Sequence, residues 1–507
     1  MENRQSWSSR LTFILAAVGS AVGLGNAWRF PGLAAKHGGG AFLLVYVIAM
    51  LVFGIPLLMM EISIGRKLKK GAAPAMRGIN KKFEPIGWAA TANAFVIVCY
   101  YAVVYAWVIL MAFMSYKFAG MTGDTVSASE LFFKTTETTG TVSDYKIPLI
   151  MIIPFLLAWG SIFYCIRNGA QSVGKVVKYT VFLPVVFLAI MAAKGLTMPG
   201  AMDGIMKLFV PDFSVLADPA IWIDAVGQVF YSLSIMMAIM FAYGSYLKDD
   251  SNIATDAMII AFCDIGVSIL AGVVMFSTMG GVGMLDSMTA SGISTAFIVY
   301  PQAIVSLTDS GVFNAIFGVI FYLCLITLAI DSAFSIIEGV SASIADKFKL
   351  NPRKTTRNVV IVAALISLIF ITRAGLAWLD IVDNWANAYN LILVGIMECI
   401  AIGWFFKPSK ILTEVNRNTK KFKMPAWWFI TSVKFIAPLL LTTLFCWNLY
   451  DLFVVKNGNY GDYPQWALFV GGWLITILVM LSGFVVKAIV AVKKKKGFVE
   501  EEIIWED

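Results

Sequence analysis

The chain has 507 residues, of which 59% are hydrophobic and only 14% charged, and its formal net charge is +8. A soluble domain carries about 25% charged residues. With a mean hydropathy of +0.80, this composition excludes an ordinary soluble enzyme, a disordered protein and a secreted disulfide scaffold. The basic excess lies in short loops, which is typical of membrane orientation rather than of nucleic-acid binding.

Apolar segments long enough to span about 30 Å of hydrocarbon follow one another along the chain. They predict an all-α polytopic membrane protein that is one transmembrane domain over residues 1–507. Its 12 helices are expected near 11–34, 41–65, 87–118, 147–165, 172–194, 222–246, 254–283, 311–344, 358–373, 377–406, 427–450 and 464–491. The longest connection, 119–146, is polar and Thr-rich, and no connection is long enough for a second domain.

The distribution of lysine and arginine orients these helices. Seven lie in 66–82, five in 346–357 and six in 407–423, whereas 284–310 has none. Positive charge stays in the cytoplasm, so residues 1–10 and the tail 493–507 are both expected there. The short termini and the absence of Asn-x-Ser/Thr sites favour the cell membrane of a bacterium or an archaeon.

Several kinds of chemistry are disfavoured by what the chain lacks. The six cysteines stand singly in apolar segments, which argues against disulfides and zinc sites. His37 is the only histidine, so a histidine-rich metal site is excluded. No GxxxxGK[ST] motif marks an ATPase. We therefore expect no enzymatic activity.

Two of the expected helices look interrupted at mid-membrane. The first carries the glycine-rich stretch 19–26, and the sixth carries Ser232-Leu233-Ser234-Ile235-Met236. They are five segments apart, which fits a five-plus-five inverted repeat over 11–195 and 222–406, followed by two more helices in 427–492. Interrupted helices at matching positions indicate the midplane site of a transporter. Glycine packing could explain Gly19 and Gly23 by themselves, but Asn26 and Arg29 immediately after them favour an interruption.

Ionisable residues within membrane helices are expensive and usually functional. The candidates are Arg29, Glu61, Asp264, Asp331, Asp383 and Glu398. Together with Asn26 and Ser232, the carboxylates offer only hard oxygen ligands, which suit a hard cation and disfavour copper or zinc.

Several motifs resemble the neurotransmitter:sodium symporter family, and particularly its bacterial sodium-coupled amino-acid transporters. They are RQSWSSRLTFILAAVGSAVGLGNAWRFP at 4–31, GGGAF at 38–42, VGQVFYSLS at 226–234, AIDSAFS at 329–335 and TRAGLAWLDIVDNW at 372–385. The resemblance covers helices 1 to 10 almost throughout, whereas helices 11 and 12 match mainly in hydrophobicity.

The resemblance implies two sodium ions and a substrate site. The first sodium would use Ala21, Asn26, Ser232 and Asp264, and the second Gly19, Val22, Leu328, Asp331 and Ser332. The substrate would contact Ala21, Gly23, Gly25, Ile97, Tyr101, Tyr231, Ser232, Ser234, Met237, Ser332 and Ile336.

The resemblance also implies gates. Arg29 and Asp383 would close the outer side, with Tyr231 as a lid. Arg4 and Asp346 would close the inner side, helped by Trp7, Ser245 and Tyr246. Gly174 and Pro184 resemble a stretch that unwinds to release the inner sodium.

Three positions depart from the family pattern. Asp264 stands where many members have Asn, near positions that hold chloride in chloride-dependent relatives and that resemble Tyr46, Gln228, Ser232 and Ser268. A carboxylate would repel chloride, so no chloride requirement is expected. Residues 235–238 lack the glycines that bacterial relatives often carry around the large residue. His37 replaces the usual Asn.

These features predict a symporter that imports neutral, hydrophobic α-amino acids with sodium by alternating access, with a monomer sufficient for transport. Two alternatives stay open. A proton-coupled permease of the same fold would titrate Asp264 and Asp331 instead of binding sodium. A transporter-like channel or sensor would show uncoupled current, or binding without accumulation.

Overall fold

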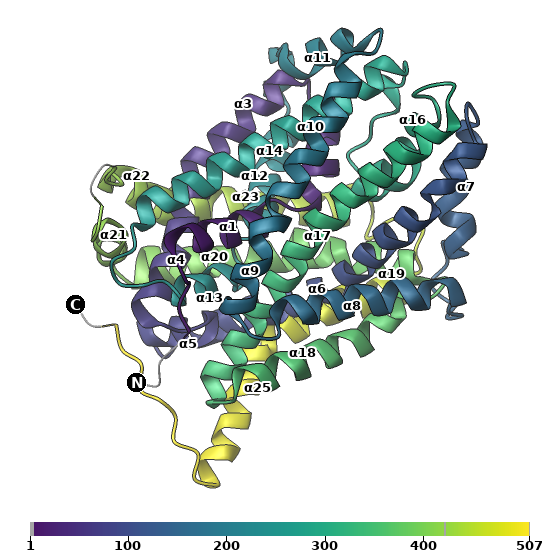
Figure 1. Ribbon diagram of the computed structural model, residues 1–507. Helices are drawn as coiled ribbons and strands as arrows, with labels where there is room; N and C mark the ends of the chain where they lie inside the picture. The colour runs from purple at the N-terminus through teal and green to yellow at the C-terminus, as the bar shows by residue number, and fades with distance from the viewer. Residues whose placement is uncertain (1–4, 420–421, 506–507) are drawn as a thin grey trace.

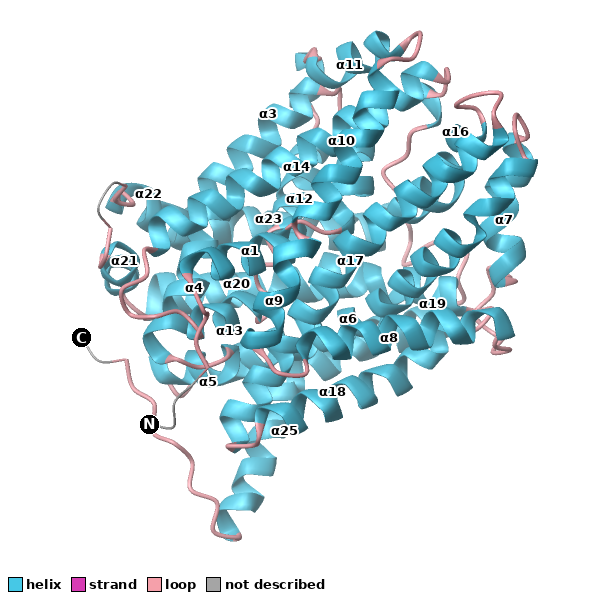
Figure 2. Ribbon diagram, in the orientation of Figure 1, coloured by secondary structure: helices cyan, strands magenta, loops and turns pink. Residues whose placement is uncertain are grey.

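The computed structural model describes residues 5–419 and 422–505. Within these ranges every regular element is a helix, apart from one isolated bridge between Gly39 and Pro211, and Figure 2 shows helices throughout the bundle. The first and last described residues lie at the same end of the bundle (Figure 1).

The first half of the chain forms α1 to α11. Their bounds are α1 Arg10–Ala21, α2 Phe30–Lys36, α3 Gly40–Ala49, α4 Ile55–Leu68, α5 Ala72–Ile79, α6 Glu84–Met114, α7 Thr125–Thr136, α8 Ile152–Ile166, α9 Ala170–Thr180, α10 Phe182–Leu196 and α11 Ala201–Phe209. Short π-helical turns join some of them into longer spans, as Met50–Gly54 joins α3 to α4.

The second half forms α12 to α25. Their bounds are α12 Pro219–Ser232, α13 Ile239–Ser245, α14 Ile253–Gly281, α15 Gly292–Ser294, α16 Tyr300–Val305, α17 Gly311–Phe348, α18 Pro352–Ser367, α19 Gly375–Trp385, α20 Ile392–Ile400, α21 Pro408–Asn416, α22 Ala426–Thr431, α23 Ala437–Tyr450, α24 Gln465–Leu468 and α25 Leu474–Lys495.

Ten helices of the described chain are long and apolar enough to cross a membrane, and the count is 11 if α1 and α2, which bend by 50°, form one span. The remaining predicted segment, 222–246, is divided at 233–238 into α12 and α13. At 1.5 Å per residue, neither half reaches across about 30 Å of hydrocarbon by itself.

Two connections that the sequence predicts as loops contain helices. α7 lies in the polar connection 119–146, and residues 292–305 form a short apolar helix in the connection 284–310. The two pack together, since the Phe132 ring stacks on Phe297 with centroids 4.3 Å apart. Each helix is too short to register as a span, and tertiary contact stabilises it.

The centre of the bundle is formed by α6 and α17, which pack along each other. The apolar window of Glu84–Gly120 is 89% buried, whereas that of Gln465–Lys495 is 22% buried. The last helix therefore lies at the periphery. α1 and α13 contact α17, so both interrupted helices lie against the central pair.

Candidate functional site

The two helix interruptions lie next to each other. α1 ends at Ala21, and Val22 already has an extended conformation with ψ 96°. In the second interruption Ser234, Met236 and Ala238 all have positive φ, at 53°, 62° and 62°. The Ser234 hydroxyl donates a hydrogen bond of 2.8 Å to the carbonyl of Ser20. Backbone groups released from both helices therefore meet.

A buried polar cluster surrounds Asn26. Its amide Nδ2 lies 2.7 Å from Asp264 Oδ1, 2.8 Å from Ser268 Oγ and 3.0 Å from Ser232 Oγ. Ser232 Oγ donates to the Asp264 carboxylate at 2.7 Å, and Tyr46 OH donates to its Oδ2 at 2.8 Å. These side chains are at most 1% exposed. Three of the four residues predicted for the first sodium thus converge.

The fourth predicted residue, Ala21, ends α1 beside this cluster, and Asn26 Oδ1 accepts the amide of Gly23 at 3.0 Å. Buried in a low dielectric, a carboxylate supplied with hydroxyl and amide donors lacks a positive partner. A hard cation that takes carbonyl, amide, hydroxyl and carboxylate oxygens fits this donor set.

The residues predicted for the second sodium lie where α1 packs against α17. A Cβ on Gly19 would lie 2.5 Å from Asp331 Oδ2, so the carboxylate rests directly on the α1 backbone. Asp331 is 2% exposed, and its Oδ1 has no hydrogen-bond partner among the described residues. Val22 follows the last turn of α1 and Leu328 precedes Asp331 by about one turn of α17. An orphaned buried carboxylate oxygen fits a cation ligand.

Between the interruptions lies a small cavity of about 20 Å³, which is room for about one water molecule. Ten of the eleven residues predicted to contact substrate line it, namely Ala21, Gly23, Gly25, Ile97, Tyr101, Tyr231, Ser234, Met237, Ser332 and Ile336. Ser232 is not among its lining residues, because its hydroxyl is engaged with Asp264. The structure also adds Ser20, Leu24 and Asn26 to the lining.

The role of Glu61 was not predicted from the sequence, although its position in a membrane helix singled it out. Its Oε1 accepts the backbone amide of Met236 at 2.6 Å, inside the second interruption. Glu61 and Glu398 are both fully buried, and Glu398 has no hydrogen-bond partner within the described ranges. Glu61 therefore acts on the interruption through the backbone.

The predicted outer gate is assembled without a direct ion pair. The Arg29 guanidinium lies 5.8 Å from the centre of the Tyr231 ring, and Asp383 accepts the Asn387 side-chain amide at 2.8 Å. Arg29 and Asp383 form no salt bridge in the described chain. Tyr231 thus contacts both the cavity and the Arg29 guanidinium.

At the inner side, Arg4 lies outside the described residues. Asp346 accepts the amide of Gly71 at 2.7 Å. Trp7 donates from its indole to the Tyr243 carbonyl at 3.0 Å and from its backbone to the Tyr246 carbonyl at 3.1 Å. The Tyr246 hydroxyl bonds to Glu338. The segment that enters α1 is therefore fastened to α13.

His37, which departs from the family pattern, has a carboxylate partner. Its Nε2 lies 2.7 Å from Asp224 Oδ2, and Lys36 binds the same oxygen at 2.8 Å. These contacts join the end of α2 to α12, the helical halves on the same side of the two interruptions.

Known proteins resemble this chain over most of its length. A model of the sodium:neurotransmitter symporter family matches residues 4–122 and 120–495. An uncharacterized sodium-dependent transporter of Methanocaldococcus jannaschii is 34% identical over 493 residues, covering 94% of this chain and 96% of that protein. The human sodium- and chloride-dependent GABA transporter 2 is 28% identical over 523 residues, covering 94% and 85%.

Among solved structures, the crystal structure of MhsT in complex with L-phenylalanine matches with a TM-score of 0.73 and 28% identity. The match covers 88% of this chain and 99% of that one. The relatives are sodium-dependent transporters and not enzymes, which confirms the expectation of a transport protein.

Proposed function

This chain belongs to the sodium:neurotransmitter symporter family, and we propose that it imports neutral, hydrophobic α-amino acids together with sodium by alternating access. The observation that carries the proposal is the meeting of the two interrupted helices around oxygen ligands, with Asn26 bonded to Asp264 and Gly19 resting on Asp331. The positive end of a half-helix and a bound cation, where they meet, attract the carboxylate group of a zwitterionic substrate.

The proposed architecture has twelve membrane spans, with α1–α2 and α12–α13 each counted as one interrupted span. Residues 11–195 and 222–406 form two inverted repeats, and 427–492 supply the last two helices. The chain is one transporter domain in the cell membrane of a bacterium or an archaeon. Both termini lie in the cytoplasm, on the side where the lysine- and arginine-rich connections gather.

Two sodium ions are proposed as co-transported substrates. The first would be held by the Ala21 carbonyl with Asn26, Ser232 and Asp264. The second would be held by carbonyls of Gly19, Val22 and Leu328 with Asp331 and Ser332. The orphaned Oδ1 of Asp331 supports the second site, because a buried charge without a counter-ion is costly.

The proposed substrate class follows from charge and from the apolar lining of the cavity. Amine transporters of the family carry Asp at the position of Gly23, which would pair with an amine, whereas Gly23 leaves room for a substrate carboxylate. Ile97, Met237 and Ile336 offer apolar surface to the side chain, and methionine adapts to different shapes. The solved relative with bound L-phenylalanine supports an amino acid with a large apolar side chain.

Equilibrium binding to the purified protein tests this proposal. A panel of amino acids is measured with sodium and with potassium in its place, alongside tryptamine as a decarboxylated competitor. Hydrophobic amino acids should bind only with sodium, and tryptamine should not displace them. Displacement by tryptamine, or by charged amino acids alone, rejects the substrate class. Sodium-free uptake driven by a pH gradient would select a proton-coupled permease instead.

We further propose that transport does not require chloride. The Asp264 carboxylate accepts hydrogen bonds from Tyr46 and Ser232, two positions that resemble chloride contacts in chloride-dependent relatives. It supplies a fixed negative charge, and a chloride ion placed against it would be repelled. Asp264→Asn should lower uptake in gluconate buffer, and added chloride should restore part of it. Loss of wild-type uptake when gluconate replaces chloride contradicts this role.

A further inference from the structure

The tail that follows α25 turns back along the end of the bundle beside α5 (Figure 1). Its residues 498–505 form no helix, so contacts with other segments must determine where they lie. The last of them, Trp505, is only 9% exposed. An indole ring that is buried at the end of an extended segment indicates a specific attachment.

The first attachment of the tail is Glu500. Its carboxylate lies 3.0 Å from a terminal nitrogen of Arg77 in α5 and 2.6 Å from Lys494 Nζ. It also pairs with Lys347 of α17, and Lys347 pairs in turn with Glu84 at the start of α6. Glu500 therefore connects the tail to α5 and to the central pair of helices, α6 and α17.

The second attachment is Trp505. Its backbone amide donates to the Gly78 carbonyl at 2.8 Å. Its ring meets the Phe406 ring edge-on, with centroids 5.6 Å apart, and the Lys67 ammonium lies 5.9 Å from the ring centre. A cation over an indole face is attracted to it. Trp505 therefore connects the tail to α5, to the end of α4 and to the segment after α20.

Charge complementarity accompanies the two attachments. The tail carries three consecutive glutamates at 500–502, and the connection 66–82 that it crosses holds seven lysines and arginines. Glu501 pairs with Lys70 at 2.9 Å and Glu502 with Lys81 at 3.4 Å. Neighbouring carboxylates repel one another, so this acidic stretch is stabilised by lying against a basic surface.

The helices at the two attachments belong to different packing units. α4 and α13 are in backbone contact, because a Cβ on Gly65 would lie 2.1 Å from the Phe241 carbonyl oxygen and one on Gly244 would lie 2.3 Å from that of Ile62. Helices packed this closely shift together. This α4–α13 unit carries one side of the second interruption, whereas α6 and α17 form the central pair. The tail crosses from one unit to the other.

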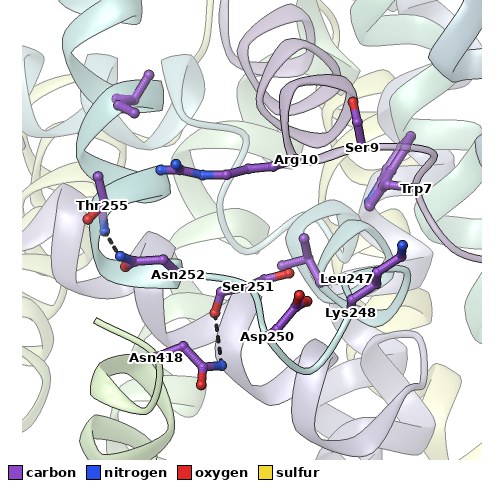
Figure 3. Close-up of a pocket in the computed structure, with 11 residues that line it drawn as sticks. Trp7, Ser9, Arg10, Leu247, Lys248, Asp250, Ser251, Asn252, Thr255 and Asn418 are labelled. Carbon is purple, nitrogen blue, oxygen red and sulfur yellow. Dashed lines mark hydrogen bonds between the residues drawn. The ribbon is translucent and has the colours of Figure 1, made fainter. Parts of the chain in front are cut away.

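Free space lies beside the α4–α13 unit at this end of the bundle. The segment that enters α1, the connection 247–252 after α13 and the first turns of α14 surround a cavity of about 610 Å³ (Figure 3). Close-packed interiors resist displacement, whereas a unit with a cavity at its side has room to shift. The contacts of the tail therefore act where packing alone leaves movement possible.

We propose that residues 498–505 act as a strap that limits how far the α4–α13 unit separates from α6 and α17 at this end of the bundle. The consequence for transport rests on the proposed function, because alternating access requires the two units to part when this end opens. Release of either Glu500 or Trp505 frees the strap. The strap therefore sets how readily this end of the protein opens.

The test measures the separation of the units in the full chain, without substrate. Ser343 of α17 is fully buried, and its hydroxyl has no hydrogen-bond partner among the described residues. A Cβ on Gly71, between α4 and α5, would lie 2.7 Å from the Ser343 nitrogen. Labelling of Ser343→Cys by a water-soluble maleimide, beyond that of the native cysteines, therefore reports separation at this contact. Hydrogen–deuterium exchange of 498–505 reports release of the tail.

Trp505→Ala removes a buried aromatic attachment and should raise both tail exchange and the Ser343→Cys labelling rate, the latter about ten-fold. Glu501→Lys places two cations together and should raise the labelling rate up to about five-fold. Adding Lys70→Glu to Glu501→Lys restores an ion pair and should return the rate toward its original value. Asp309→Lys, at an exposed carboxylate after α16, is the matched control and should leave the rate unchanged.

Three results overturn the proposal. Unchanged labelling in Trp505→Ala, with raised exchange in 498–505, means that the released tail does not restrain the units. Failure of Lys70→Glu to reverse the effect of Glu501→Lys means that the ion pair does not act as a fastening. An equal rise in Asp309→Lys assigns the effect to net charge. These measurements need neither amino acid nor sodium, so failure of the proposed function would appear separately, as absent sodium-dependent binding.

Discussion

The two helix interruptions meet at one site but are built differently. The first, at 22–24, contains Gly23 and lies between Gly19 and Gly25, and none of the three has a positive φ. The second, at 233–238, contains no glycine, yet three of its residues have left-handed backbone conformations. Glycine is thus present where its conformational freedom is unused, and absent where that freedom would be favoured.

Space explains the glycines of the first interruption. A Cβ on Gly23 would lie 2.8 Å from Ser332 Oγ, and one on Gly25 would lie 2.6 Å from the Tyr231 ring. These residues let the α1 segment approach α17 and Tyr231 closely. The first interruption is therefore set by what must fit against the backbone.

Hydrogen bonds explain the second interruption. Left-handed conformations cost a non-glycine residue about 1–2 kcal/mol, so surrounding contacts must hold them. Ser234 is held through its hydroxyl to Ser20, and Met236 through its amide to Glu61. A segment without glycine can therefore still break a helix when buried polar partners from other helices fix its backbone.

The largest effect is expected when the space of the first interruption is filled. In Gly19→Ala the new methyl group would meet Asp331 Oδ2 at 2.5 Å and a Val181 methyl at 2.9 Å, so neither side can yield easily. Overpacking costs about 1–3 kcal/mol. Moving the Asp331 carboxylate to relieve the clash displaces a proposed sodium ligand, so sodium affinity should fall by up to about 100-fold, measured as the sodium concentration that half-saturates substrate binding.

Gly266→Ala is the matched control, because a Cβ there would meet nothing within 4 Å. It should leave sodium affinity unchanged. If Gly19→Ala behaves like Gly266→Ala, close approach is not the reason for glycine at the first interruption.

A smaller effect is expected when the polar support of the second interruption is removed. Glu61→Leu leaves the Met236 amide buried without its acceptor, which costs about 1–3 kcal/mol. Melting temperature and uptake should both fall. Glu61→Gln keeps a carbonyl oxygen for the amide and should lose less. Equal losses in the two variants would mean that the hydrogen bond does not hold the interruption.

Adding glycine to the second interruption is expected to change the melting temperature in the opposite direction. Ala238→Gly places glycine at a φ of 62° and removes a strain of about 1 kcal/mol, so the melting temperature should stay equal or rise. Ala242→Gly, at an equally buried alanine inside α13, should lower it by the usual helical cost of about 1 kcal/mol. Destabilisation of the same size in both would contradict left-handed strain at Ala238.

The smallest effect concerns a contact far from both interruptions, where charge rather than backbone geometry connects segments. Glu500, after α25, pairs with Lys494 at 2.6 Å, with Arg77 at 3.0 Å and with Lys347. Burial alone would raise the pKa of Glu500, but the cations bring this pKa below its ordinary value. The contribution to stability is therefore present above the ordinary carboxyl pKa and is lost as pH falls through the lowered pKa.

Because partly exposed ion pairs are screened, this contribution should be below about 1 kcal/mol. The difference in melting temperature between wild type and Glu500→Gln should shrink between pH 7 and pH 4. A difference that grows as pH falls would contradict the pairing.

Much of the site was predictable because a few residue types in a membrane helix have few uses. Asn26, Asp264 and Asp331 stood out as polar groups in apolar segments, and the structure brings the first two within 2.7 Å of each other. The glycines around 19–25 pointed to the first interruption. Glu61 stood out for the same reason as the aspartates, but its partner did not, because a backbone amide 175 residues away leaves no mark in the sequence.

The sequence by itself determined that this protein is an all-helical membrane transporter, because apolar length, charge in loops and family motifs are properties of local stretches. Only the tertiary structure decided how the second interruption is held, which connections contain helices, and that a large cavity lies beside α14. Each of these depends on contacts between segments far apart in the chain. The backbone of 233–238 takes its conformation from Glu61 and Ser20 rather than from its own residues, and a local pattern cannot encode a neighbour that folding supplies.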